Sequence, residues 1–152
     1  MRETNMRSGF TMIELIFVIV IIGILAAVAV PKLFATRNDA YISAIAHETM
    51  VAAWEVAAYA TAKGSTASTI TAMSNSAKSL VNNGYATEES AKLKITAIDV
   101  ADCVEITIEN QGANTEMLKI KFIESGGNCD RLQNLIDAND FPMPLKGRLV
   151  VY

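Results

Sequence analysis

The stretch GFTMIELIFVIVIIGILAAVAVP, residues 9–31, decides the architecture of this chain. From Ile13 to Val30 every residue is apolar or glycine except one carboxylate, Glu14. The apolar run from Phe10 to Val30 contains about 21 residues, close to the ~20 that a helix needs to cross a bilayer. An acidic side chain inside such a run costs free energy unless it lies near the interface or finds a partner. The position of Glu14 therefore needs an explanation.

Three kinds of segment share this pattern. In a cleaved signal peptide, basic residues such as Arg2 and Arg7 precede the apolar run, and small residues such as Ala27-Val28-Ala29 end it. The second alternative is a plain membrane anchor, and the third is a segment that is processed before the apolar run. Neither a signal peptide nor an anchor requires Glu14, so the carboxylate favours the third alternative.

The residues Gly9-Phe10-Thr11-Met12-Ile13-Glu14-Leu15 resemble the prepilin peptidase site of the type IV pilin superfamily. The resemblance implies that a basic leader is cut between Gly9 and Phe10, and that Phe10 is then N-methylated. It also implies that Glu14 of one subunit pairs with the N-terminal amine of a neighbouring subunit in a filament. Gly23 and Pro31 fall where many pilins carry residues that weaken the helix.

This pairing has a physical reason. A free amine on Phe10 is cationic near neutral pH, and methylation keeps the charge. An unpaired carboxylate within a bundle of apolar helices is strongly penalised. We therefore expect the Glu14–amine pair to specify axial register more than to add net stability. The alternative is that Glu14 reaches the lipid headgroups, which we expect before assembly.

The helix is expected to continue beyond Pro31. Good helix formers follow, and residues at helical spacing form an amphipathic face. These residues are Ile45, Thr49, Ala52, Val56 and Tyr59. We predict one helix from about Thr11 to Lys63 that stops at Gly64, with a kink or local melting near Gly23–Pro31.

The remainder predicts one further helix and a sheet. Helical spacing indicates a short helix over about 69–82, and Glu88-Glu89 is a candidate turn of helix. Alternating apolar and polar residues predict strands with one buried face and a solvated, charged outer face. These strands are 92–98, 103–109 and 117–123, with a hairpin loop at 110–114, one or two helical turns at 131–136, an extended stretch at 141–144 and a last strand at 147–152.

The expected fold class is α+β and pilin-like, a long N-terminal helix packed on an antiparallel sheet of about four strands. Residues 1–9 form the leader peptide, and 10–31 form the half of the helix that lies in the membrane or filament core. Residues 32–152 form the globular head, which includes the amphipathic half of the helix.

Two cysteines, Cys103 and Cys129, are the only thiols. In an exported protein they suggest a disulfide, and in a reducing compartment they would be two free thiols. Many type IV pilins close a disulfide near the C-terminus, so the resemblance implies that these two residues are bonded.

The sequence offers little material for catalysis or metal binding. His47 is the single histidine, which leaves no triad or zinc set, and a structural role is expected. Trp54 and Tyr59 are expected to pack between helix and head. Asp99, Asp102 and Asp130 are candidate calcium ligands, but no closely spaced acidic loop supports them. We expect no enzyme activity, no cofactor and no metal.

The resemblance implies a structural subunit of a type IV filament. Expected partners are the prepilin peptidase and N-methyltransferase, related pilin subunits, an inner-membrane assembly platform and membrane lipid. The expected location is the inner membrane, single-pass with the head outside the cytoplasm, and then a filament. The alternative is a pseudopilin of a type II secretion system. A soluble exported binding module released after Ala29 is a further alternative. The net charge of −3 without a basic cluster does not indicate nucleic acid binding.

Overall fold

A computed structural model of the chain describes residues 9–111 and 115–145. The predictions for the leader before Gly9, for the tip of the 110–114 loop and for the last strand at 147–152 lie outside these residues. The chain divides into two compact units, Met1–Arg37 and Asn38–Tyr152, and each is described by itself. The elements are α1 (Met12–Lys63), α2 (Asn75–Asn82), β1 (Ala86–Glu89), β2 (Lys92–Ala97), β3 (Val100–Glu109), β4 (Met117–Phe122), α3 (Asn128–Leu135) and β5 (Met143–Pro144).

Helix α1 confirms the predicted long helix to within one residue at its start. It ends as expected, because Gly64 adopts a positive φ of 70° and donates its N–H to the carbonyl of Ala60 at 2.9 Å. We expected a kink or local melting near Gly23–Pro31. Local melting is absent, since α1 is helical without interruption through Gly23 and Pro31, and the kink stays a prediction. One proline removes a single backbone donor, and the turns on either side keep their hydrogen bonds.

Among the described residues the sheet has five antiparallel strands in the order β1-β2-β3-β4-β5. Strands β2, β3 and β4 were predicted, whereas β1 and β5 are additional strands. The additional strand β1 contains Glu88 and Glu89, so the helical turn predicted there is wrong. Glu88 pairs with Leu93 and Glu89 with Lys92, and Ser90 turns the chain with a φ of 58°. Strands β2, β3 and β4 occupy the predicted segments, but β3 begins three residues earlier than expected. The one or two helical turns predicted at 131–136 are confirmed, because residues 131–135 lie in α3.

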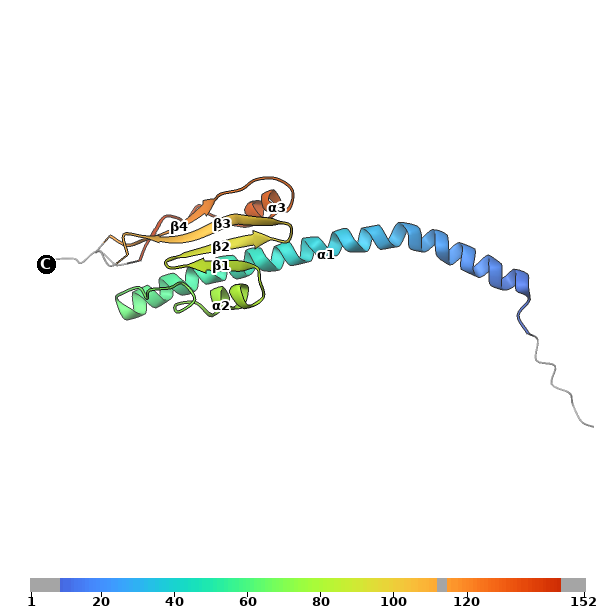
Figure 1. Ribbon diagram of the computed structural model, residues 1–152, viewed down its shortest axis with the longest axis horizontal. Coiled ribbons are helices and arrows are strands. Elements are labelled where there is room, and N and C mark those ends of the chain that lie inside the picture. Colours follow the sequence, from blue (N-terminus) through green and yellow to red (C-terminus); the bar gives the residue numbers. More distant parts are fainter. Residues whose placement is uncertain (1–8, 112–114, 146–152) are drawn as a thin grey trace, which may run out of the picture. The chain divides into compact units, whose positions relative to one another are not determined.

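The core lies between the sheet and the second half of α1 (Figure 1). Of the predicted helix face, Thr49, Ala52 and Val56 are buried together with Ile45, and Tyr59 is partly buried. The strands contribute their alternate apolar side chains to the same core. These are Leu93, Ile95, Val104, Ile106, Ile108 and Leu118. Because several α1 positions in this contact are alanine, the helix backbone can approach the sheet closely.

The outer face of the sheet differs from the solvated face that we expected. Glu105 and Thr107 are only 6% and 3% exposed, so β3 is buried on both sides over 103–108. Glu109 forms ion pairs with Lys119 at 2.6 Å and with Lys121 at 3.2 Å. These lysines hold the pKa of Glu109 below its ordinary value. Strand β3 is central, so lysines of both neighbouring strands stand opposite Glu105 and Thr107. They are Lys94 and Lys121 opposite Glu105, and Lys92 and Lys119 opposite Thr107.

Three carboxylates accept hydrogen bonds from the segment that connects α1 to the sheet. Glu55 of α1 accepts hydrogen bonds from Ser74 and Ser76, Glu88 of β1 from Thr71, and Glu116 from Thr66. Ser74 also accepts the N–H of Ala77 and caps α2. This cap explains why α2 starts at Asn75, six residues after the predicted start.

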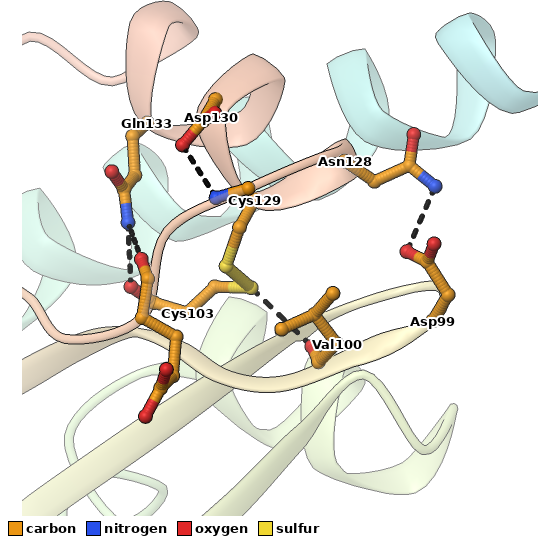
Figure 2. Close-up of a disulfide and its surroundings, with 9 residues drawn as sticks. Asp99, Val100, Cys103, Asn128, Cys129, Asp130 and Gln133 are labelled. Atoms are coloured by element: carbon orange, nitrogen blue, oxygen red, sulfur yellow. Dashed lines mark hydrogen bonds between the residues drawn. A yellow bond between two sulfur atoms is a disulfide. The ribbon is translucent and has the colours of Figure 1, made fainter.

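Cys103 of β3 and Cys129 of α3 form a disulfide, with their Cα atoms 5.4 Å apart (Figure 2). The bridge closes 26 residues of chain, and in the loop-entropy model it stabilises the fold by about 3 kcal/mol. Gln133 of α3 adds a second connection, because its amide donates to the carbonyls of Cys103 and Glu124 at 3.0 and 2.5 Å. Helix α3 is therefore connected to β3 by the disulfide and by the hydrogen bond of Gln133.

Candidate functional site

The start of α1 is capped by Thr11. The carbonyl of Thr11 accepts the N–H of Leu15 at 3.2 Å, and its hydroxyl accepts the N–H of Glu14 at 3.3 Å. In return, Oε2 of Glu14 accepts both the backbone N–H and the hydroxyl of Thr11, at 2.8 and 2.7 Å. This reciprocal arrangement is a capping box, in which threonine and the glutamate three residues later satisfy each other's groups.

The capping box gives Glu14 a local role that the sequence argument missed. The pattern Thr-x-x-Glu directly before an apolar run is a signal for it, and it stands at Thr11–Glu14. The carboxylate lies in the first turn of α1, where the positive end of the helix dipole favours negative charge. Both effects reduce the free energy that a carboxylate costs at the head of an apolar helix.

The apolar half of α1 is exposed throughout. Its large side chains range from 41% exposed at Ile21 to 77% at Met12, and Leu33 and Phe34 are 69% and 61% exposed. Within residues 9–111 and 115–145, α1 is the one helix that is long and apolar enough to cross a membrane, by length and composition. An apolar surface of this extent marks contact with lipid or with another protein.

The predicted processing residues and the predicted helix-weakening residues lie in the same unit. Gly9 and Phe10 are exposed and precede the first helical residue, Met12, so the bond between them is outside the helix. Gly23 and Pro31 lie within α1. Glu14 is therefore four residues from Phe10 and, in the described part of the chain, is bonded to Thr11.

The three aspartates considered as calcium ligands each interact with a nitrogen atom of the protein. Asp99 accepts a hydrogen bond from Asn128 at 2.8 Å, Asp130 accepts the N–H of Gly126 at 2.7 Å, and Asp102 lies 3.9 Å from the amine of Lys94 (Figure 2 shows the first two aspartates). Over the residues that the structure describes, no group of three or more histidine, cysteine, aspartate or glutamate side chains is arranged to hold a metal.

We expected structural roles for His47, Trp54 and Tyr59 of α1, and the first two are more exposed than such roles imply. Trp54 is 46% exposed and its ring lies 6.2 Å from that of Phe141, whereas Tyr59 packs against the core. His47 is exposed. Packing is thus confirmed for Tyr59 and only partly for Trp54.

Comparisons with known proteins find similarity over part of the chain. Residues 4–30 match the family described as "Prokaryotic N-terminal methylation motif". The chain is also 48% identical over 40 residues to type II secretion system core protein G of Escherichia coli strain K12. That alignment covers 26% of this chain and 28% of the relative, so it leaves most of both proteins unmatched.

No solved structure matches the chain. The observed α+β architecture, a long apolar N-terminal helix and an antiparallel sheet, is consistent with a pilin-like fold. The methylation motif and the secretion-system relative support the assignment, predicted from residues 9–15, of this chain to the type IV pilin and pseudopilin superfamily.

Proposed function

We propose that this chain is a structural subunit of a type IV filament. Prepilin peptidase cuts it between Gly9 and Phe10, the same enzyme methylates Phe10, and the mature subunit polymerises through its apolar helix. The observation that carries the proposal is the exposed apolar half of α1, headed by a carboxylate that its own capping box holds in place.

Assembly follows from the chemistry of that half-helix. Before assembly, lipid covers the exposed side chains and anchors the subunit in the inner membrane, with the head outside the cytoplasm. An assembly platform then draws subunits from the membrane, and neighbouring helices replace the lipid. Identical subunits joined head to tail form an open helical filament when the rotation between neighbours does not close a ring, and we propose this arrangement here.

Glu14 sets the register of this assembly. Its Oε2 is bonded to Thr11 of the same subunit, and the carboxylate also pairs with the cationic N-terminal amine of a neighbour. In an apolar bundle a subunit in the wrong register leaves both charges unpaired, which is strongly disfavoured.

A second candidate is a pseudopilin of a type II secretion system, and the relative from Escherichia coli favours it. The two candidates share the N-terminal chemistry and differ in what the filament does. Deleting the gene and assaying secretion of folded exoproteins separately from surface filaments distinguishes them.

The N-terminal mass of the mature protein tests the proposal. A methylated peptide that begins at Phe10 supports it, whereas a chain that begins at Val30 identifies a conventional signal peptide and a soluble exported module. Glu14→Ala and Glu14→Val are expected to stay membrane-inserted but to form few filaments. Normal filaments from either variant would contradict the pairing role.

A further inference from the structure

Large apolar side chains are unevenly distributed over the surface of the head. Among the described residues of the compact unit Asn38–Tyr152, six such side chains are at least 38% exposed: Tyr41, Trp54, Ile98, Phe122, Ile123 and Leu135. Scattered exposed apolar residues are normal on a protein, whereas a group of them at one place marks contact with lipid or protein. Their positions in the fold therefore matter more than their number.

Leu135 and Ile123 lie at the end of the unit where α1 enters it. Leu135, the last residue of α3, lines a hollow together with Asp39 and Ile42 of α1. Ile123 donates its N–H to the carbonyl of Cys103 at 3.1 Å, and the disulfide joins Cys103 to α3. Both residues are therefore close to α3, which Figure 1 shows at this end of the sheet.

The end of β4 and the turn between β2 and β3 contribute two more of these side chains. Phe122, the last residue of β4, pairs with Val104, which is next to the disulfide in the chain. Ile98 precedes Asp99, whose carboxylate accepts a hydrogen bond from Asn128 at the start of α3 (Figure 2). Both segments thus approach the same helix.

The last two side chains are separated along α1. Tyr41 is next to Ile42 in the chain and completes the group that we call the apolar end, which consists of Tyr41, Ile98, Phe122, Ile123 and Leu135. Trp54 lies about 20 Å further along the helix axis, with its ring 6.2 Å from that of Phe141. In the described part of this unit, five of the six exposed large apolar side chains are therefore at one end.

The apolar end is also the part of the head that the chain keeps nearest to the membrane segment. As a helix, the run from Phe10 to Val30 measures about 31 Å, which matches the ~30 Å hydrocarbon layer. Residues 31–37 add about 10 Å of continuous helix before Asn38, and a headgroup layer is about 5–8 Å thick. The length of the helix therefore keeps the apolar end beside the headgroups when the subunit is inserted.

We propose that the apolar end rests on the outer surface of the bilayer while the subunit is in the membrane. Its ligand is the interfacial layer of phospholipid, which the apolar side chains enter between the headgroups. The inference rests on the proposed function, because it needs a membrane-inserted subunit. Asp99 and Asp130 are exposed at the same end, so apolar insertion rather than attraction to anionic lipid provides the contact. This contact fixes the orientation of the head before assembly, which anchoring by α1 alone does not.

The single tryptophan of the chain, Trp54, allows a fluorescence test. Full-length protein is placed at one copy per nanodisc in phosphatidylcholine that is brominated near the headgroup end of one acyl chain, because bromine quenches a tryptophan that touches it. In a Trp54→Phe background, Leu135→Trp and Ile123→Trp are expected to be quenched at least roughly threefold more than native Trp54. Both positions are exposed, so the fold has room for the larger ring.

Phe17→Trp in the same background is the control for insertion, because Phe17 lies in the apolar half of α1 and should be quenched by bromine deeper in the acyl chain. Equal quenching of Leu135→Trp, Ile123→Trp and native Trp54, whether strong or absent, overturns the lipid contact. Absent quenching is also the result expected if a second copy rather than lipid covers the apolar end. If Phe17→Trp is quenched in that case, the filament proposal survives and only the head contact fails. If Phe17→Trp is unquenched as well, the chain is not inserted and the proposed function fails.

Discussion

Thr11 donates two hydrogen bonds to a single oxygen of Glu14, through its hydroxyl at 2.7 Å and its backbone N–H at 2.8 Å. The bonds fix the carboxylate against the first turn of α1. The start of the helix and the proposed register contact therefore use the same carboxylate.

Replacing Thr11 by valine tests this relationship. The shape of the side chain is kept, but the hydroxyl that bonds Glu14 and caps α1 is lost, at about 1 kcal/mol for the cap. We expect Thr11→Val to insert into the membrane and to be cleaved, with a lower yield of filaments than wild type. Filaments sheared from cells and quantified against total subunit measure the effect.

Thr11→Ser is the matched control because serine keeps the hydroxyl. It should assemble close to the wild-type level. If valine and serine assemble equally well, the hydroxyl does not position Glu14 for assembly, and the capping box only starts the helix.

The carboxylate of Glu55 ties α1 to α2 and predicts a pH dependence. Hydrogen bonds from the Ser74 hydroxyl and then the Ser76 N–H hold the pKa of Glu55 below its ordinary value. A group with a lowered pKa in the folded state contributes stability at neutral pH, and this contribution is lost as pH falls through the folded pKa. Glu55→Gln should cost about 1 kcal/mol at pH 7 and progressively less below about pH 4.5.

Denaturant unfolding of the detergent-solubilised protein at several pH values measures this difference. Other acids titrate over the same range in both proteins, so the gap between wild type and Glu55→Gln isolates the contribution of Glu55. A gap that does not change with pH would show that the loss is one of packing and not of the charged hydrogen bonds.

Sequence patterns predicted the elements whose residues repeat over several turns or pairs. Helix α1 has a long apolar run followed by an amphipathic face, and β2, β3 and β4 each alternate over at least six residues. The stop at Gly64 followed from the freedom of glycine at positive φ. The pairing of Cys103 with Cys129 was anticipated from the cysteine count and the resemblance.

The elements that the patterns missed depend on tertiary partners. Strand β1 has four residues and two adjacent glutamates, so it shows no clear alternation; it forms because β2 pairs with it. Strand β5 has two residues and exists through its pairing with β4. The start of α2 is set at Ser74, which Glu55 holds from 19 positions earlier in the chain. Local spacing contains none of these contacts.

The disulfide is expected to supply a large share of the stability around α3. Replacing both Cys103 and Cys129 by serine should lower the free energy of unfolding by about 3 kcal/mol. The loss should be concentrated in α3, since this helix then keeps only its hydrogen bond from Gln133 to Cys103 and the packing of its buried side chains, such as Leu132. Hydrogen exchange of the full-length protein followed by mass spectrometry measures it. Unchanged protection of residues 128–135 in the double variant would contradict this role.

Strand β3 carries ion pairs on the outer face of the sheet and apolar side chains in the core. Salt should weaken the ion pairs but not the apolar packing. Glu109 binds Lys119 and Lys121 at the sheet surface, whereas Ile106 is fully buried. Glu109→Gln should destabilise the head in low salt, and the difference from wild type should vanish near about 1 M salt, where the screening length is ~3 Å. Ile106→Ala leaves a cavity and should cost about 2–5 kcal/mol at both salt concentrations. Denaturant midpoints at two ionic strengths give both comparisons, and a loss for Glu109→Gln that persists in high salt would mean that its stem, rather than its charge, supports β3.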